Sequence, residues 1–180
     1  MRTIMKRITA LVLAIGTLMA LVMLVSCGGT KDAVEEFLTS DSYTFKAGKQ
    51  TVKVDKSSVY YNNGVVESYL YYNKGDRRYY YCEINKEKEI DKQSIDSEEY
   101  IIYHDKMVAI VGQTSKLLSG FLQSSHMLEE VEGTYTVDNY TIKEAEGVIT
   151  CTVGASTAKI SDVGTTRIDI PDKVLDAIAR

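Results

Sequence analysis

The sequence is poor in several residue types on which particular protein classes depend. It contains one proline, no tryptophan, three cysteines and two histidines in 180 residues. So little proline excludes a collagen-like or proline-rich chain, and 44% hydrophobic residues excludes a disordered one. The isolated His104 and His126 and the few cysteines match no metal-ligand spacing, so we expect no metal site.

Basic charge is also scarce. The 21 Lys and Arg residues are outnumbered by 25 Asp and Glu residues, which gives a net charge of −4. A nucleic-acid partner needs a strong positive field, so none is expected.

Catalytic motifs are missing as well. The sequence has no G-x-S-x-G motif, no H-E-x-x-H motif and no phosphate-binding glycine loop, and Ser124-Ser125-His126 is more typical of a helix end than of a nucleophile and its base. We therefore expect neither an enzyme nor a bound cofactor.

The first 27 residues contain no acidic residue. Arg2, Lys6 and Arg7 precede an apolar run over residues 8–25. A charged front followed by an apolar stretch is typical of a secretory signal peptide. The run is also long enough to cross a membrane, so an uncleaved transmembrane anchor is the alternative.

The segment Leu24-Val25-Ser26-Cys27 favours the signal peptide, because it resembles the lipobox of bacterial lipoproteins. The resemblance implies cleavage between Ser26 and Cys27 and attachment of diacylglycerol, with palmitate-type chains, to the Cys27 thiol. It also implies a protein held at the cell membrane, on its extracytoplasmic face, by this lipid. The chain then divides into a signal peptide (1–26), a lipidated tether (27–31) and a single α+β domain (32–180).

Apolar periodicity predicts the elements of that domain. Helical spacing of Val34, Phe37 and Leu38 predicts a short helix over 32–39. From Tyr43 the period changes to two, and Asn63-Gly64 predicts a tight type I′ turn that joins strands 59–61 and 65–72. Further strands are expected at 77–84, 134–137, 140–142, 147–153, 157–160 and 166–170. The fold class is α+β, with a large antiparallel sheet and helices packed on it.

Residues 98–112 fit two structures. Tyr100, Tyr103 and Met107 fall at helical spacing, and Asp96 with Glu99 is typical of a helix-capping box. The many β-branched residues and Gly112 favour a hairpin of 99–104 against 107–112, which is the structure we predict. A short helix from Thr114 to about Met127 follows in either case.

Cys82 and Cys151 each lie in a predicted strand. An exported protein can keep a disulfide, so the two thiols could join distant strands. They could equally be two small buried apolar residues, as free cysteines often are. The sequence leaves both possibilities open.

Tyrosine is the most unusual feature of the composition. All 13 tyrosines follow residue 27, and eight lie between Tyr60 and Tyr81. Side chains alternate along a strand, so both faces of these strands should be aromatic. The rings could serve cross-strand packing, or they could present an amphipathic lining for a ligand or a partner.

The order of elements resembles the LolA/LprG-like lipoprotein fold. The matching residues are Leu117-Leu118-Ser119-Gly120, followed by Leu128 and 134–137, and the terminal segment Ser161–Pro171. The resemblance implies that the sheet curls into a half-barrel and that helices cover its concave face. It also implies that acyl chains bind between sheet and helices, as in a noncatalytic carrier.

Residues on the elements that would line such a groove are candidates for ligand contact: Tyr69, Tyr71, Leu117, Leu118 and Phe121. The main hypothesis is a membrane-anchored binder or carrier of an apolar ligand or lipid. The alternative is a surface module that docks a partner protein through exposed tyrosines.

Overall fold

The computed structural model describes residues 29–177. The predicted signal peptide, Ser26 and Cys27 lie outside these residues. The first described helix, α2, spans Thr30–Thr39 and buries Val34 and Phe37. It begins two residues before the predicted start, so Thr30 and Lys31 belong to the helix rather than to a tether.

The predicted antiparallel sheet is present and contains 11 strands. Those before the long helix are β1 Ser42–Ala47, β2 Gln50–Asp55, β3 Ser58–Asn62, β4 Glu67–Asn73, β5 Arg78–Ile84 and β6 Ile90–Ile95. Those after it are β7 Glu130–Val131, β8 Thr134–Val137, β9 Tyr140–Ala145, β10 Val148–Val153 and β11 Ser156–Ser161. Strand β6 was not predicted, because its charged sequence lacks an apolar alternation.

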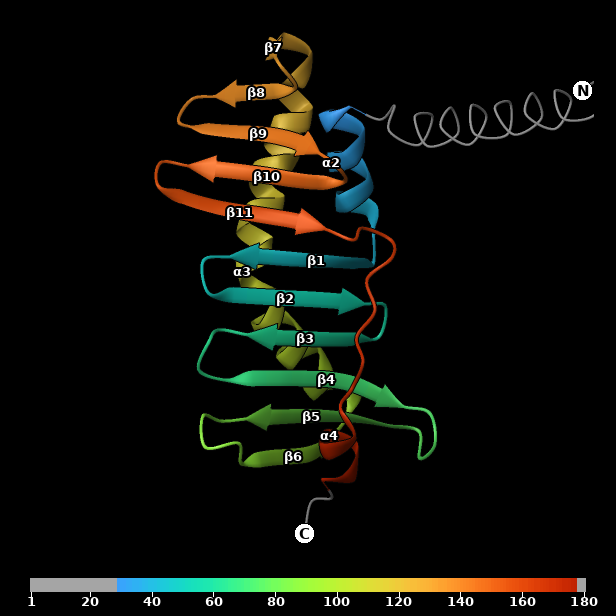
Figure 1. Cartoon of the computed structure of the whole chain (residues 1–180). Coiled ribbons are helices and arrows are strands. Elements are labelled where there is room, and N and C mark those ends of the chain that lie inside the picture. The colour runs from blue at the N-terminus through green and yellow to red at the C-terminus, as the bar shows by residue number, and fades with distance from the viewer. Residues whose placement is uncertain (1–28, 178–180) are drawn as a thin grey trace, which may run out of the picture.

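The strand order is β6-β5-β4-β3-β2-β1-β11-β10-β9-β8-β7, and all neighbours are antiparallel (Figure 1). Two meanders therefore meet in the middle of the sheet, where β1 pairs with β11. The sheet is open, with β6 at one edge and β7 at the other. The fold class is thus α+β with one large antiparallel sheet.

The hairpin predicted over residues 99–112 is wrong. Helix α3 spans Ser97–Ser124 without interruption, and a short 3-10 helix, η1, follows at Ser125–Met127. The Asp96 carboxylate accepts hydrogen bonds from the backbone N–H groups of Glu98 and Glu99, and the Glu99 carboxylate accepts one from the Asp96 N–H. The capping box therefore indicated the correct structure.

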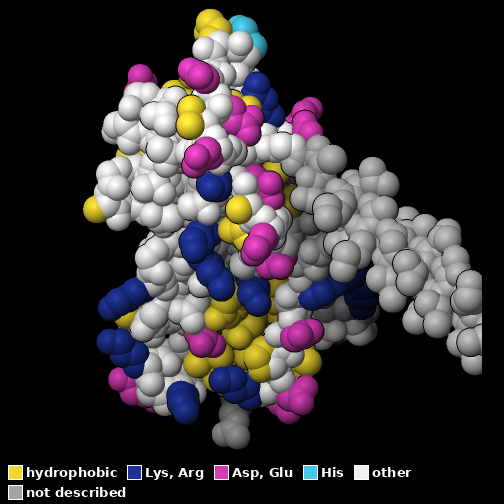
Figure 2. Space-filling model, turned by 45° about the horizontal axis from the view of Figure 1, so that its top comes forward, with side chains coloured by type: hydrophobic (Ala, Val, Ile, Leu, Met, Phe, Trp, Pro, Cys, Tyr) yellow, Lys and Arg dark blue, Asp and Glu magenta, His cyan; other side chains and the backbone are white. Residues whose placement is uncertain are grey.

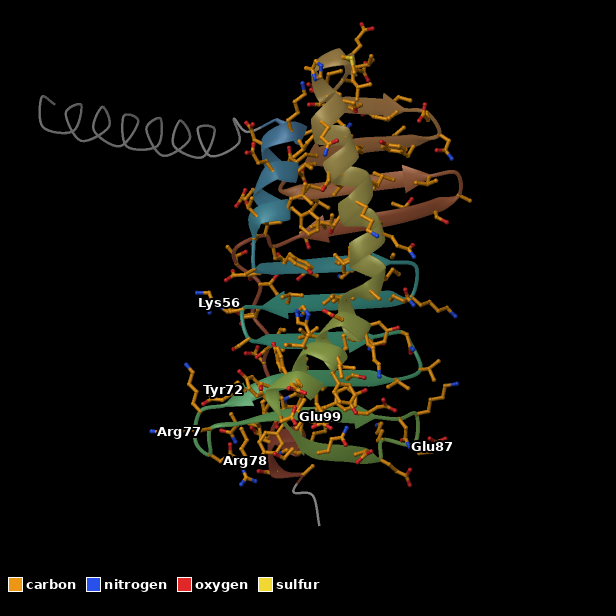
Figure 3. The ribbon with its side chains drawn as sticks, turned by 180° about the vertical axis from the view of Figure 1, so that it is seen from behind. Lys56, Tyr72, Arg77, Arg78, Glu87 and Glu99 are labelled. Atoms are coloured by element: carbon orange, nitrogen blue, oxygen red, sulfur yellow. The ribbon has the colours of Figure 1, made fainter. Side chains whose placement is uncertain are left out.

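The sheet explains why α3 is a helix. This segment must connect β6 at one edge to β7 at the other. Ten strand spacings of about 4.8 Å give a width of roughly 48 Å, and a helix of 28 residues covers about 42 Å. In Figure 3, α3 runs across the strands beside α2. Burial of Met107, Val111 and Leu118 against the sheet outweighs the weak strand preference of the β-branched residues.

The C-terminal segment crosses the opposite face of the sheet. Residues 166–170, predicted as a strand, belong to no strand. They run over β1 to β4 towards α4, Asp172–Asp176 (Figure 1). The buried Thr166 fixes the segment, because its hydroxyl lies 3.1 Å from that of Thr44 and its carbonyl accepts a hydrogen bond from Ser42.

The β3–β4 connection also differs from the prediction. The connection comprises residues 63–66 rather than the two residues of a tight type I′ turn. The Asn63 Oδ1 accepts hydrogen bonds from the backbone N–H groups of Val65 and Val66, both at 2.9 Å, and Gly64 alone takes a positive φ, of 82°. The side chain of Asn63 therefore supplies bonds that a longer turn needs.

Candidate functional site

The five residues predicted to line one groove lie on two faces of the sheet. Leu118 and Phe121 are fully buried in the core between α3 and the sheet. Tyr69 and Tyr71 belong to a second cluster, on the face that the C-terminal segment crosses. The intervening Leu70 points to the helix side. A single groove lined by all five residues was therefore a wrong prediction.

An apolar groove does exist between α3 and the sheet, and Leu117 lines it. We call it the α3 groove; it lies beside the β1–β2 and β10–β11 turns and has a volume of about 260 Å³. Its lining residues are Phe45, Ala47, Ile110, Gln113, Thr114, Leu117, Cys151, Val153, Ser156, Thr157 and Ala158. Most of these were missed by sequence reasoning, because only the pairing of β1 with β11 brings Ala47 opposite Ala158.

The chemistry of the α3 groove suits an uncharged ligand. No lining residue is charged, and the polar groups are one amide and three hydroxyls. Burial raises the pKa of the Cys151 thiol to about 11, so this side chain stays protonated and behaves as a small apolar group. The volume is just below the usual range for small-molecule sites, which suits one narrow apolar group.

The disulfide between Cys82 and Cys151 is excluded. Both cysteines are free and buried. Cys151 lies in the helix-side core and Cys82 in the cluster on the other face. Five strands separate β5 from β10, which corresponds to roughly 29 Å, whereas bonded cysteines have Cα atoms about 4.4–6.8 Å apart. The alternative, two buried apolar thiols, describes the structure.

The tyrosines pack on both faces, as predicted. On the helix side, Tyr79 and Tyr81 contact Tyr100 and Tyr103 of α3, with ring centroids 4.6 and 4.1 Å apart. On the other side, two cross-strand pairs, Tyr60–Tyr69 and Tyr71–Tyr80, lie 5.1 and 5.7 Å apart. The rings thus contribute to the core on both faces of β4 and β5.

This packing leaves little aromatic surface for a partner. All 13 tyrosines lie in the described region, and each is buried or half-buried. Tyr79 and Tyr81, which an interaction module would present on its surface, lie under α3. Docking through exposed tyrosines therefore lacks the feature on which it was based.

Tyr71 carries an unusual energetic cost. Its side chain is 3% exposed, and its hydroxyl has no hydrogen-bond partner among the described residues. Burial raises the pKa of this hydroxyl to about 12. A buried hydroxyl without a partner costs about 1–3 kcal/mol of desolvation.

Replacing Tyr71 with phenylalanine is expected to raise the free energy of unfolding by about 1 kcal/mol, because it removes the unpaired group and keeps the ring. Urea denaturation followed by circular dichroism measures this. The matched control is Tyr81→Phe, which removes a hydroxyl that donates to Glu83 at 2.8 Å and should lower stability by about as much. A loss of stability in Tyr71→Phe would contradict the prediction.

The hydroxyls of the two serines that precede His126 donate to backbone carbonyls rather than to the histidine. The Ser124 hydroxyl donates to the Gly120 carbonyl at 3.0 Å, and the Ser125 hydroxyl donates to the Leu122 carbonyl at 2.9 Å. These bonds satisfy carbonyls at the end of α3.

Within residues 29–177, no three His, Cys, Asp or Glu side chains gather as metal ligands would. None of the helices in this range has both the length and the apolar character needed to cross a membrane.

Comparisons with models of protein families, with curated proteins and with solved structures found no match to this chain.

Proposed function

We propose that the protein is a lipid-anchored, extracytoplasmic lipoprotein that binds an uncharged apolar ligand in the α3 groove without catalysing a reaction. The ligand would be an alkyl chain or similar narrow group whose end carries a hydrogen-bonding function. The observation that carries the proposal is the uncharged, mostly apolar lining of this groove.

The groove can supply affinity and orientation. Burying apolar surface is worth about 25 cal/mol per Å², so a ligand that loses 200 Å² of exposed surface gains about 5 kcal/mol before the costs of association. Gln113 and Thr114 of α3 offer hydrogen-bonding groups beside Leu117. The absence of a lining charge disfavours a fatty acid relative to an alcohol or ester.

The sequence supports the setting of this proposal. The lipobox segment ending at Cys27 is the basis for membrane attachment, and the resemblance to LolA/LprG-like lipoproteins is the basis for a noncatalytic carrier. The core beside the groove is filled by Leu118 and Phe121, so the ligand would occupy the open groove rather than an internal cavity. The proposed carrier therefore holds one chain at the edge of the helix–sheet interface.

A photoactivatable, uncharged fatty alcohol tests the proposal in the native membrane. After illumination, mass spectrometry should find the label on peptides from 110–117 and 151–158, which together line the groove. Ala158→Phe fills the groove and should reduce this labelling about tenfold, which corresponds to the loss of roughly 60 Å² of buried apolar contact.

Ala145→Phe is the matched control, because Ala145 is exposed and does not line the groove. It should label as the unchanged protein does. Labelling that is absent from both peptides, or that is equal in the two variants, would contradict the proposal.

A further inference from the structure

A second pocket lies on the opposite face of the sheet, between β1–β4 and the C-terminal segment. We call it the basic pocket; its volume is about 390 Å³. Its lining residues are Lys46, Thr51, Lys53, Tyr60, Tyr69, Arg167, Ile168 and Asp169. Three cations thus face one carboxylate, in a chain whose overall charge is negative.

The strand register concentrates positive charge here. Lys46 of β1 lies directly opposite Lys159 of β11 on the same face, and Lys53 lies on the next strand, β2. Lys143 of β9 continues the row beyond Thr150. Figure 2 shows Lys and Arg side chains along the middle of this face, above an apolar patch. Like charges directly opposite each other destabilise a sheet, so this arrangement costs stability.

No carboxylate of the described region lies within salt-bridge distance of these cations. The one ion contact among residues 29–177 joins His104 and Asp105, at 3.4 Å. Asp169 lines the pocket but lies beyond salt-bridge distance of Lys46, Lys53 and Arg167. The basic side chains are therefore free to bind an external anion.

The buried Tyr69 points to the same ligand chemistry. Its side chain is 6% exposed and packs against Tyr60, yet it lines the pocket. Its hydroxyl forms no hydrogen bond with another described residue and is not sealed in the core as that of Tyr71 is. Burial and, after it, the negative charge of Glu67 raise the pKa of Tyr69 to about 12, so the group remains a hydrogen-bond donor. A donor of this kind, beside three cations, is suited to an oxyanion.

We propose that the basic pocket binds a phosphate or diphosphate group, held by Arg167, Lys46 and Lys53 with the Tyr69 hydroxyl as a neutral donor. Arginine binds phosphate oxygens in a bidentate manner, and lysine adds point charges. The phosphate could come from a small soluble compound or from a phospholipid headgroup. The site lies across the sheet from the α3 groove, so it does not depend on the function proposed for that groove.

Calorimetry of the full-length protein in nonionic detergent micelles tests the proposal with two probes. One is inorganic pyrophosphate, and the other is phosphatidic acid in the micelles, with phosphatidylcholine as its reference. The double variant Lys53→Gln/Arg167→Gln should weaken binding at least tenfold, and Tyr69→Phe by about three- to tenfold. Lys116→Gln, an exposed position on α3 across the sheet, should stay within twofold.

The outcomes separate the sources and decide the proposal. Binding of pyrophosphate that is lost in the double variant assigns a soluble phosphate compound, and binding of phosphatidic acid alone that is lost in this variant assigns a lipid headgroup. Lys46→Gln relieves the repulsion with Lys159 and should fold even where the double variant does not, while still weakening binding. Binding of neither probe, or an equal loss in Lys116→Gln, would overturn the site.

Discussion

Truncating Phe121 to alanine is expected to lower the free energy of unfolding by about 3–5 kcal/mol. Phe121 is fully buried where α3 meets the sheet, and its ring packs edge-on against that of Tyr135, with centroids 5.1 Å apart. Removing the ring loses its burial free energy and leaves a cavity that α3, held along its length, cannot close. The effect is large because α3 joins the two edges of the sheet.

Urea denaturation followed by circular dichroism measures this change. The matched control is Ile101→Ala on the same helix, where the side chain is 59% exposed. It should change stability by no more than about 0.5 kcal/mol, since little apolar surface is lost and alanine favours the helix. Equal effects of the two substitutions would show that the core does not lie beneath α3.

The prediction of α3 failed for a physical reason that only the complete sheet reveals. Locally, the β-branched residues near Ile101 and Ile102 favour a strand, and both side chains are exposed in the helix. The decisive contribution to the free energy comes from long-range contacts, because the segment must cross the sheet and buries Met107 and Val111 against it. The capping pair Asp96 and Glu99 and the helical spacing of the apolar residues were the local signals for the helix.

The alternation along β4 was predicted correctly, but the position of the helix was not. Alternation predicted aromatic rings on both faces of these strands, and the structure has Tyr69 and Tyr71 on the face opposite to Leu70. Alternation within a strand does not predict which of the two apolar faces of the sheet a helix distant in sequence will cover. The candidate groove consequently combined residues from both faces, and of the five only Leu117 lines the α3 groove.

The basic pocket could not be predicted from the sequence either. Lys46 and Lys159 lie in β1 and β11, the first and last strands along the chain, and no local pattern indicates that these two strands pair. Arg167 comes from a segment predicted as a strand, which instead crosses the sheet. Short-range patterns therefore predicted most of the strands, whereas both pockets depend on contacts between the two ends of the domain.

Replacing Cys27 with serine is expected to abolish both acylation and cleavage of the signal peptide. A serine hydroxyl does not form the thioether that the lipobox resemblance implies, so the proposed cleavage before residue 27 should not follow. Metabolic labelling with a palmitate analogue should fall to background, and mass spectrometry should find residues 1–26 still attached. Cys151→Ala, which removes a buried thiol, should keep full labelling.

The position of Cys27 makes this experiment informative about the folded domain. Helix α2 begins at Thr30, so three residues at about 3.3–3.6 Å each would keep the attachment point of the proposed acyl chains within roughly 11 Å of the helix. Two acyl chains bind a membrane stably, at about 0.8 kcal/mol per buried methylene, and would keep the α3 groove close to its lipid source. Membrane fractionation alone is insufficient, because the uncleaved apolar run of the serine variant could itself span the bilayer. Equal labelling and equal cleavage in Cys27→Ser would remove the lipid anchor, and with it the setting of the proposed carrier.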